Sequence, residues 1–482
     1  MSTNHIISAA VAGVEAYQVD VEVDLGQGMA GFMTLGLPAG AAIRESRTRV
    51  KSAIENCGYK FPQRRVTVNL APAHIRKEGT AFDLPIALGI LQATGALPAG
   101  ALAGTLAIGE LALNGRIRPV RGVLPIAARA REFGAERILV PTENGAEAAV
   151  VEGLEVLTAD HITQVVDALR GGTPLPVTLP PSKGGETTGN GADLADIRGQ
   201  ALAKRALEIA AAGRHNLLFV GGPGTGKTML ARRLPSILPP MSQAEQIEAS
   251  TVASVAGLLR PDQPLVGRPF RAPHHSVSDI ALIGGSPHER PGEISLAHNG
   301  VLLLDELPEF RRSALEALRQ PMEDGQVVIA RARYRLTYPA RAMIVASMNP
   351  CPCGYYGRPQ RACACSEAAV KAYWQRVEPM LRYFDMQVAI STVTASELRD
   401  TVPAETSATV RARIDAAPKH NCMELTADAS RVLATAIDRR DLSARAHDRI
   451  LKVARTIANL AGEERIGTVH VAEAIEFAGG KR

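Results

Sequence analysis

The stretch LLFVGGPGTGKTMLARRL, from Leu217 to Leu234, constrains the fold more than any other part of this 482-residue chain. An apolar strand pattern runs into a glycine-rich turn, and a helical pattern follows at once. In such a turn the backbone N–H groups close around phosphate oxygens, aided by the positive end of the helix dipole. Lys227 is placed to reach the β- and γ-phosphates, and the Thr228 hydroxyl to bind Mg²⁺. The predicted nucleotide-binding residues of the turn are Gly221, Gly222, Pro223, Gly224, Thr225, Gly226, Lys227 and Thr228. The chain is therefore predicted to have an α/β fold and to bind a nucleotide.

Two further apolar strands supply the groups that nucleotide hydrolysis needs. In NGVLLLDELPEF, which begins at Asn299, four apolar residues precede Asp305 and Glu306. Asp305 is placed to hold Mg²⁺, and Glu306 is the candidate for orienting and deprotonating the attacking water. The strand AMIVASMNP ends at Asn349, whose amide is a candidate for holding that water against the γ-phosphate. A turn-forming asparagine is the alternative. ATP and Mg²⁺ are the predicted cofactors.

Pattern and composition divide the chain into four segments. Residues 1–170 mix alternating apolar strands with helical runs. Residues 171–193 are rich in Gly, Pro, Ser and Thr and are expected to form an exposed linker. An α/β pattern covers 194–390, and a helical pattern covers 391–482. Several domains are expected, because a chain of this length exceeds one ordinary core.

Three long segments resemble the ComM/YifB family of ATPases, which are related to the ATPase subunit of magnesium chelatase. They are DLADIRGQALAKRALEIAAAGRHNLLFVGGPGTGKT, RPFRAPHHSVSDIALIGGSPHERPGEISLAHNGVLLLDELPEF and LEALRQPMEDGQVVIARARYRLTYPARAMIVASMNPCPCGYYG. The likeness extends over nearly all of the chain and includes the order of the domains. It implies a P-loop AAA+ module with a C-terminal helical lid, and a hexameric ring with ATP sites at subunit interfaces. It further implies a DNA helicase that promotes branch migration during natural transformation.

One position departs from the family pattern. Relatives read SGPLLDRIDL where this chain reads VEPMLRYFDM from Val377, so Tyr383 replaces an arginine expected to act on a neighbouring subunit's ATP. Arg382 is one substitute, since arginine stabilises charge on a transferring phosphoryl group. An arginine elsewhere and weak ATP turnover are the alternatives. By the same resemblance, Arg445 matches the sensor arginine that reaches from the helical lid to the γ-phosphate, with a solvated helix cation as the alternative.

The first segment resembles a Lon-type serine protease without its catalytic pair. In KEGTAFD the position of the nucleophilic serine is Ala81, and the position of the partner lysine is Leu124. An alkyl side chain cannot attack a carbonyl, and leucine cannot accept a proton. Thr80 offers a hydroxyl one residue away, but it lacks a base. We therefore expect an α+β Lon-protease-like (S5-like) domain that serves in subunit association or in guiding DNA.

Four of the six cysteines lie in CPCGYYGRPQRACAC, as two C-x-C pairs nine residues apart. Four thiolates this close in sequence can surround one tetrahedral Zn²⁺ at about 2.3 Å from each sulfur. The spacing is shorter than the usual C-x-x-C knuckle, and reduced buried thiols are the alternative. The candidate zinc ligands are Cys351, Cys353, Cys363 and Cys365. His274 and His275, which are adjacent to each other in the sequence, are interpreted as a hydrogen-bonded structural pair.

The segment EDGQVVIARARYRLTYPAR alternates as a β-hairpin does, directly before the strand that ends at Asn349. In the family that the chain resembles, a hairpin at this place points into the central pore. Arg331, Arg333 and Arg335 fall at spacing two and so share one face of a strand, with Tyr334 near the tip. These four residues are the predicted DNA contacts, because they offer charge for phosphates and a ring that stacks on a base. A solvated hairpin edge is the alternative.

Composition limits the setting of the protein. The first residues lack a basic region followed by an unbroken apolar stretch, and no run of 18 apolar residues is present. A cytoplasmic protein without a membrane partner is expected, and a net charge of +5 permits a polyanionic one. We interpret the chain as an AAA+ ATPase, expected to be a hexamer, that acts on single-stranded or branched DNA. The alternatives are a magnesium-chelatase-type motor that remodels a protein partner and, disfavoured by Ala81 and Leu124, an ATP-dependent protease.

Overall fold

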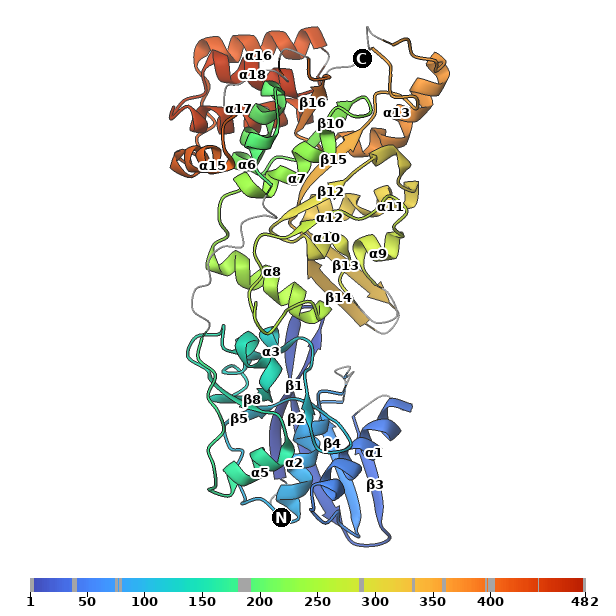
Figure 1. Cartoon of the computed structure of the whole chain (residues 1–482), viewed down its shortest axis with the longest axis vertical. Helices are drawn as coiled ribbons and strands as arrows, with labels where there is room; N and C mark the ends of the chain where they lie inside the picture. Colours follow the sequence, from blue (N-terminus) through green and yellow to red (C-terminus); the bar gives the residue numbers. More distant parts are fainter. Residues whose placement is uncertain are drawn as a thin grey trace. The chain divides into compact units, whose positions relative to one another are not determined.

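The computed structural model describes residues 4–36, 41–73, 77, 80–180, 192–285, 290–331, 334–357, 361–394, 397, 404–440 and 442–479. The chain folds into two compact units, whose elements are labelled in Figure 1. The first unit comprises Met1–Gly185, Ser250–Val266 and Ala330–Tyr338. The second comprises Glu186–Ala249, Gly267–Ile329 and Pro339–Arg482. The sequence boundary between the two lies inside the predicted linker, of which residues 181–191 are outside the described part.

The first unit is built on a seven-stranded mixed sheet in the order β3-β4-β2-β1-β5-β8-β9. β1 and β2 form an antiparallel hairpin, whereas β5, β8 and β9 run parallel. In β4 every second residue is buried, namely Val66, Val68 and Leu70, because side chains at spacing two share one face of a strand. The strands are β1 (Asn4–Ala12), β2 (Glu15–Gly26), β3 (Gly31–Leu35), β4 (Arg65–Ala71), β5 (Thr105–Ala107), β8 (Arg137–Pro141) and β9 (Glu155–Ala159), with a separate small sheet of β6 (Glu110–Leu111) and β7 (Ile117–Arg118).

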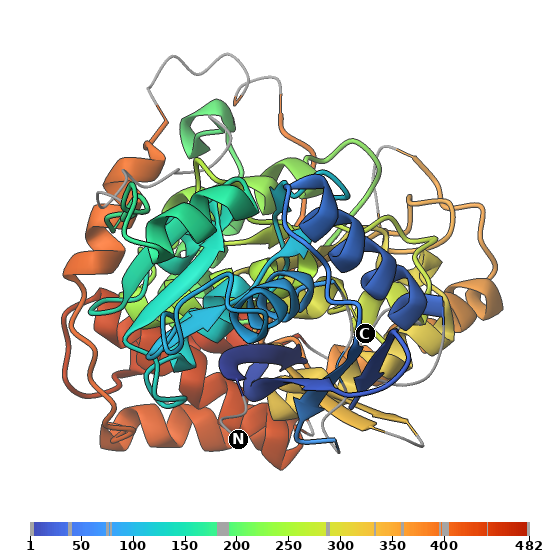
Figure 2. The same cartoon turned by 90° about the horizontal axis from the view of Figure 1, so that it is seen from below.

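Helices cover both faces of this sheet. Side chains of α1 (Ala41–Asn56), α2 (Asp83–Ala93) and α5 (Ile162–Leu169) share one hydrophobic core with the strands, and α1 and α2 lie side by side (Figure 2). Side chains of α3 (Val123–Arg129) and α4 (Gly145–Ala148), which follows the 3-10 turn η1 (Thr142–Asn144), belong to a second core on the opposite face. The predicted α+β character of this region is confirmed.

The second unit contains a five-stranded parallel sheet in the order β11-β12-β15-β10-β16. Its central strands are buried along their whole length, as expected for a parallel sheet that is covered on both faces. Because all five strands run the same way, their carboxyl ends meet at one edge, where α/β proteins bind ligands. The strands are β10 (Leu217–Gly221), β11 (Phe270–Arg271), β12 (Val301–Leu304), β15 (Met343–Met348) and β16 (Met386–Ile390).

The region after β16 is helical, as predicted. Its helices α15, α17 and α18 pack against α6, α7 or β16 and share one hydrophobic core with the parallel sheet. The helices of this part of the chain are η2 (Leu194–Asp196), α6 (Ala201–Gly213), α7 (Lys227–Ile237), α8 (Gln243–Ala256), α9 (Asp279–Ile283), α10 (Glu293–Leu296), η3 (Leu307–Glu309), α11 (Arg312–Ala317), α12 (Arg319–Asp324), α13 (Glu367–Leu381), α15 (Ser407–Ala416), α16 (Ala427–Arg440), α17 (Ala444–Leu460) and α18 (Thr468–Phe477).

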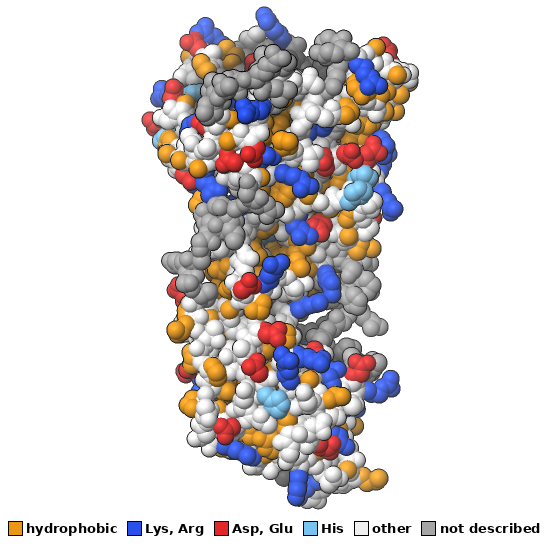
Figure 3. All heavy atoms as spheres, viewed as in Figure 1, with side chains coloured by type: hydrophobic (Ala, Val, Ile, Leu, Met, Phe, Trp, Pro, Cys, Tyr) orange, Lys and Arg blue, Asp and Glu red, His pale blue; other side chains and the backbone are white. Residues whose placement is uncertain are grey.

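The predicted hairpin before β15 is present as a two-stranded sheet of β13 (Gln326–Arg331) and β14 (Tyr334–Pro339). On the face of the molecule in Figure 3, acidic and basic side chains are interspersed, which agrees with the small net charge of +5. No helix within the described ranges is both long enough and apolar enough to span a membrane.

Candidate active site

The glycine-rich turn joins a buried strand to a helix, as the sequence predicts. β10 ends at Gly221, and α7 begins at Lys227. Gly224 and Gly226 have left-handed backbone conformations, with φ of 73° and 88°, which glycine adopts at no steric cost. A β-carbon added at either glycine would meet no described atom within 4 Å. This open backbone gives phosphate oxygens close access to the N–H groups of the turn.

Lys227 connects the turn to the neighbouring strand. Its ammonium group donates to the carbonyl oxygens of Gly221 (2.8 Å) and Gly222 (2.9 Å), and to Oδ1 of Asn349 (3.2 Å). Asn349 directly follows β15, which pairs in parallel with β10, so the sheet itself brings the amide to the lysine. The structure thus places two of the predicted site residues, Lys227 and Asn349, in one group.

Asp305 is held through both of its carboxylate oxygens. The Thr228 hydroxyl donates to Oδ2 at 2.8 Å, and the Ser347 hydroxyl donates to Oδ1. Hydroxyl and carboxylate oxygens are the hard ligands that Mg²⁺ takes beside substrate phosphates. The residues at this edge of the sheet therefore fit a nucleotide with Mg²⁺, in the roles that the sequence predicts.

Glu306 follows Asp305 but has a different partner. Its φ of 58° is left-handed, a conformation that a non-glycine residue keeps only when its surroundings hold it. The side chain is 59% exposed, and its Oε2 lies 3.2 Å from Nδ1 of His275. The His275 ring stacks on His274, with centroids 4.0 Å apart, and meets Phe310 edge-on at 6.5 Å. An exposed carboxylate beside Asp305 is placed to accept a proton from water.

The four predicted zinc ligands come together after β15. Their sulfur atoms lie within 4.8 Å of one another, with Cys351–Cys353, Cys353–Cys363 and Cys351–Cys363 separations of 3.3, 3.5 and 3.6 Å. Around a tetrahedral zinc with bonds of about 2.3 Å, sulfur atoms lie about 3.8 Å apart. The donor set and its spacing therefore fit one Zn²⁺.

Comparison with known proteins decides the family. Three family models match this chain. The model of magnesium chelatase, subunit ChlI, matches residues 193–398, the model of subunit ChlI of Mg-chelatase matches residues 21–144, and the model of the C-terminal part of subunit ChlI matches residues 408–478. Competence protein ComM of Haemophilus influenzae is 43% identical over 501 residues, which cover 99% of this chain and 97% of ComM. The chain belongs to the ComM/YifB family. The YifB protein of Salmonella typhimurium is 41% identical over 499 residues, with 99% of this chain and 97% of that protein covered. As a member of this family, the protein is a magnesium-chelatase-type ATPase.

The first unit carries the partial likeness of this ComM/YifB member to Lon proteases. Lon protease 2 of Bacillus subtilis is 28% identical over 122 residues, which cover 25% of this chain and 21% of the protease. Ala81 lies two residues before the start of α2, and Leu124 is fully buried in α3. The Thr80 hydroxyl donates to Glu110, and the buried Lys77 ammonium donates to the carbonyl oxygen of Pro72. The predicted positions of the protease pair are thus an alanine and a core leucine.

The position at which this ComM/YifB member departs from its family lies in a cluster of charged groups. The Tyr383 hydroxyl donates to Glu323 at 2.5 Å, and Arg382 donates to the Tyr383 oxygen at 2.6 Å. The hydrogen bond from Tyr383 lowers the pKa of Glu323, and the charges of Arg382, Arg319 and Arg445 add to this effect. Arg445 lies at the start of α17, and its predicted role at the γ-phosphate stays a prediction. Arg382 is engaged within its own subunit, with its guanidinium 3.7 Å from Glu323.

The described part of the hairpin holds some of the predicted DNA contacts. Arg331 is the last residue of β13, Tyr334 is the first of β14, and Arg335 is exposed. Arg333 lies outside the described residues. Arg331 and Arg335 thus lie on two different strands, so the prediction that the arginines share one face of a single strand is wrong. The DNA contacts themselves stay a prediction.

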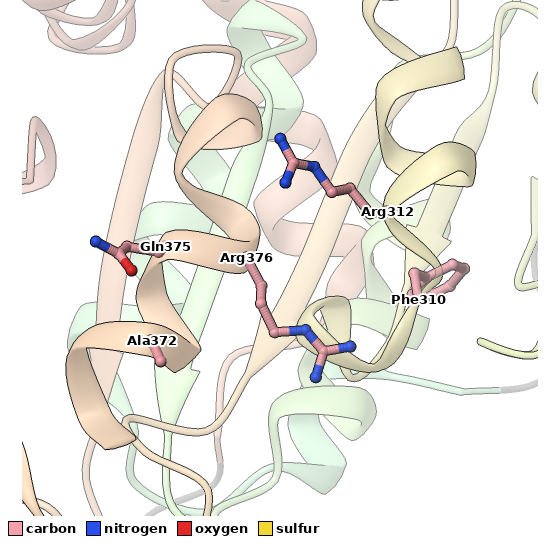
Figure 4. A pocket seen from close by; sticks show the side chains of 5 residues that line it. All are labelled: Phe310, Arg312, Ala372, Gln375 and Arg376. Carbon is pink, nitrogen blue, oxygen red and sulfur yellow. The ribbon is translucent and has the colours of Figure 1, made fainter. Parts of the chain in front are cut away.

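A cavity of about 210 Å³ lies beside Phe310, the residue that follows the short turn η3. The side chains of Arg312, at the start of α11, and Arg376, on α13, line it together with Phe310 (Figure 4). Phe310 is also the ring that meets His275 edge-on. Two of the residues that line this cavity are thus cations.

Sequence reasoning missed two residues of the site. Ser347 lies two residues before Asn349 in a strand that the sequence identifies, so its place on the same face was a usable signal. His275 was interpreted only as part of a structural pair. His274 does form such a local bond, to Ser276 at 2.9 Å, whereas His275 contacts Glu306. That contact joins residues 31 positions apart, and no local pattern indicates it.

Proposed function

We propose that this ATPase forms a ring and acts on DNA. We propose further that it is a helicase that promotes branch migration in natural transformation or recombination. The observation that carries the proposal is the 43% identity, over 99% of the chain, to a protein named for competence. The hairpin supports it, because the arginines at and near its tip offer positive charge to a phosphate backbone. A hexamer and a cytoplasmic location are part of the proposal and follow from the family resemblance.

The chain's own residues divide the work of hydrolysis among them. Lys227 and the N–H groups of the turn bind phosphate oxygens, and Thr228 with Asp305 holds the cation. Mg²⁺, when bound, neutralises charge that develops on the phosphates. Asn349 orients the attacking water, and Glu306 accepts its proton. Arg382 contacts Tyr383 and Glu323 of its own subunit, so another arginine supplies the charge that Tyr383 lacks at the interface with a neighbouring subunit.

The test is ATP turnover by the full chain with single-stranded, duplex and branched DNA, and without DNA. We expect DNA to stimulate turnover, most strongly as branched or single-stranded DNA, and expect the protein to exchange strands of a labelled four-way junction. Turnover that no DNA changes, and no strand exchange, would overturn the DNA proposal. It would favour the second candidate, an ATPase that remodels a protein partner, which the matches to chelatase subunit models support.

We also propose that the four clustered cysteines bind structural zinc. Protein purified under reducing conditions is expected to contain about one zinc per chain, as a closed four-cysteine site does. The measurement is elemental analysis of the wild type beside a Cys363→Ser, Cys365→Ser variant. Zinc in the wild type but not in the variant supports the site. Freshly purified, reduced wild type without zinc would contradict it.

His275 is proposed to orient the glutamate that accepts the proton. His275→Ala is expected to lower kcat for ATP by up to about fivefold, because it removes the ring nitrogen that lies 3.2 Å from the exposed Glu306 carboxylate, and such exposed contacts contribute about 0.2–1 kcal/mol. Nucleotide affinity should change little, since His275 contacts Glu306 and not the P-loop residues described above. His275→Gln keeps a donor and should recover part of the rate. His274→Ala is the matched control, and a rate loss as large as that of His275→Ala would assign the effect to ring packing instead.

A further inference from the structure

The loop that carries the cysteines comes close to the P-loop at Gly354. Gly354, which lies between Cys353 and Cys363, has a left-handed φ of 82°, and its N–H donates to the carbonyl oxygen of Cys351 at 2.9 Å. A β-carbon added to Gly354 would lie 2.5 Å from Cδ and 2.8 Å from Cγ of Pro223. Only a residue without a side chain fits so close to the P-loop proline. The loop that carries the cysteines therefore forms one wall of the phosphate-binding turn.

Two further contacts join the same loop to the hydrolysis site. Cys351 comes two residues after Asn349, whose Oδ1 accepts a hydrogen bond from Lys227. The carbonyl oxygen of Pro350, between them, accepts a hydrogen bond from Nε1 of Trp374 at 3.0 Å. Helix α13, which carries Trp374, has its N-cap at Ser366, directly after the last cysteine. A change in the cysteine loop thus acts on the end of β15 and on the P-loop together.

Within its described residues, 351–357 and 361–365, this loop buries only Cys351 and Gly354. Cys351 is buried, but the other three cysteines are only half-buried, and Tyr356 is 50% exposed. A loop that buries so little apolar surface gains little free energy from packing. Metal bonds at four thiolates supply folding free energy outright in such segments.

We propose that the metal bound by Cys351, Cys353, Cys363 and Cys365 sets the nucleotide affinity of the ATP site, by holding Gly354 against Pro223. With the metal in place, the P-loop wall is ordered before the nucleotide arrives. Without it, nucleotide binding carries the cost of ordering both segments, and affinity falls. The inference rests on the zinc site of the proposed function and is independent of the action on DNA.

The first experiment compares nucleotide affinity with and without zinc, in the absence of DNA. Fluorescent mant-ADP is titrated into the full chain as purified, after zinc removal by a chelator under reducing conditions, and after zinc is restored. We expect about tenfold weaker binding without zinc, within the usual range for coupled sites, and recovery on restoring it. Because coupling is reciprocal, ADP should strengthen zinc retention against the chelator by the same factor. Equal affinities with and without zinc, in protein shown to lose and regain one zinc, would overturn the coupling and leave the zinc site intact.

A pair of glycine variants separates the contact from the metal. Gly354→Ala places a side chain against Pro223 while all four cysteines remain. Gly357→Ala is the matched control, because Gly357 lies in the same loop with a left-handed φ of 74°, and an added β-carbon there meets nothing within 4 Å. We expect Gly354→Ala to weaken mant-ADP binding several-fold more than Gly357→Ala, with zinc content equal in both. Equal mant-ADP affinities of the two variants would show that Gly354 does not couple the metal site to nucleotide affinity. If wild-type protein contains no zinc when freshly purified, both this inference and the zinc site are wrong. The proposed action on DNA is tested separately, by DNA-stimulated turnover, and does not depend on these results.

Discussion

Glu306→Gln is expected to abolish most ATP turnover while leaving ATP bound. Glutamine matches glutamate in size but cannot accept a proton, and general-base catalysis contributes at least about 100-fold to a rate. The side chain does not hold the P-loop lysine or Asp305, so nucleotide affinity should be preserved. Steady-state ATP hydrolysis and mant-ADP titration on the same preparations measure the two quantities.

Lys227→Ala should show the opposite pattern. Lys227 is the cation placed at the phosphates, and hydrogen bonds to charged groups contribute about 1.5–3 kcal/mol each, so nucleotide binding should weaken by about 100-fold.

Glu309→Gln is the matched control for Glu306→Gln, since Glu309 is an exposed carboxylate three residues further along the same turn. Wild-type turnover in Glu306→Gln, or equal losses in Glu306→Gln and Glu309→Gln, would show that another group accepts the proton.

Replacing Arg333 and Arg335 with alanine is expected to weaken DNA binding by at least tenfold and to flatten its dependence on salt. For every phosphate that the protein no longer neutralises, the slope of log affinity against log salt becomes shallower by about 0.7 on single-stranded and about 0.9 on duplex DNA. A ring would repeat this effect in every subunit. Fluorescence anisotropy of labelled single-stranded and branched DNA at several salt concentrations gives both the affinity and the slope.

The control for the hairpin removes the same charge elsewhere. Arg431 and Arg465 are 80% and 70% exposed and pair with Asp428 and Glu424 on the surface of the helical region. Replacing both with alanine changes the net charge of the chain as much as the hairpin variant does. If the two double variants lose DNA affinity equally, the hairpin binds DNA only through the overall charge of the protein.

The site residues that could be predicted share one property: each follows a strand. Gly221, Asp305 and Asn349 come directly after buried apolar strands or end them, and parallel strands bring such positions to one edge. The cysteine cluster was also predictable, because its four members lie within fifteen residues. In both cases the information is local, either in a strand and its end or in one short segment.

What sequence could not supply depends on contacts between distant segments. The pairing of His275 with Glu306 and the approach of Gly354 to Pro223 follow from sheet order and loop course, which leave no periodic signal. The left-handed backbone of Glu306 is likewise set by its surroundings and not by its residue type.

The core shared by the parallel sheet and the C-terminal helices has a consequence for how mutations would be distributed. Leu217 and Phe219 of β10 belong to the same apolar cluster as Val453 and Ile457 of α17. Segments that share a core unfold together, so their amide protons should exchange with solvent at similar rates. A screen for inactive variants would therefore return many positions in the helical C-terminal region that touch no phosphate. Variants at those positions would lose activity because the whole domain unfolds cooperatively. Only inactive variants that stay folded would identify residues that take part in ATP hydrolysis.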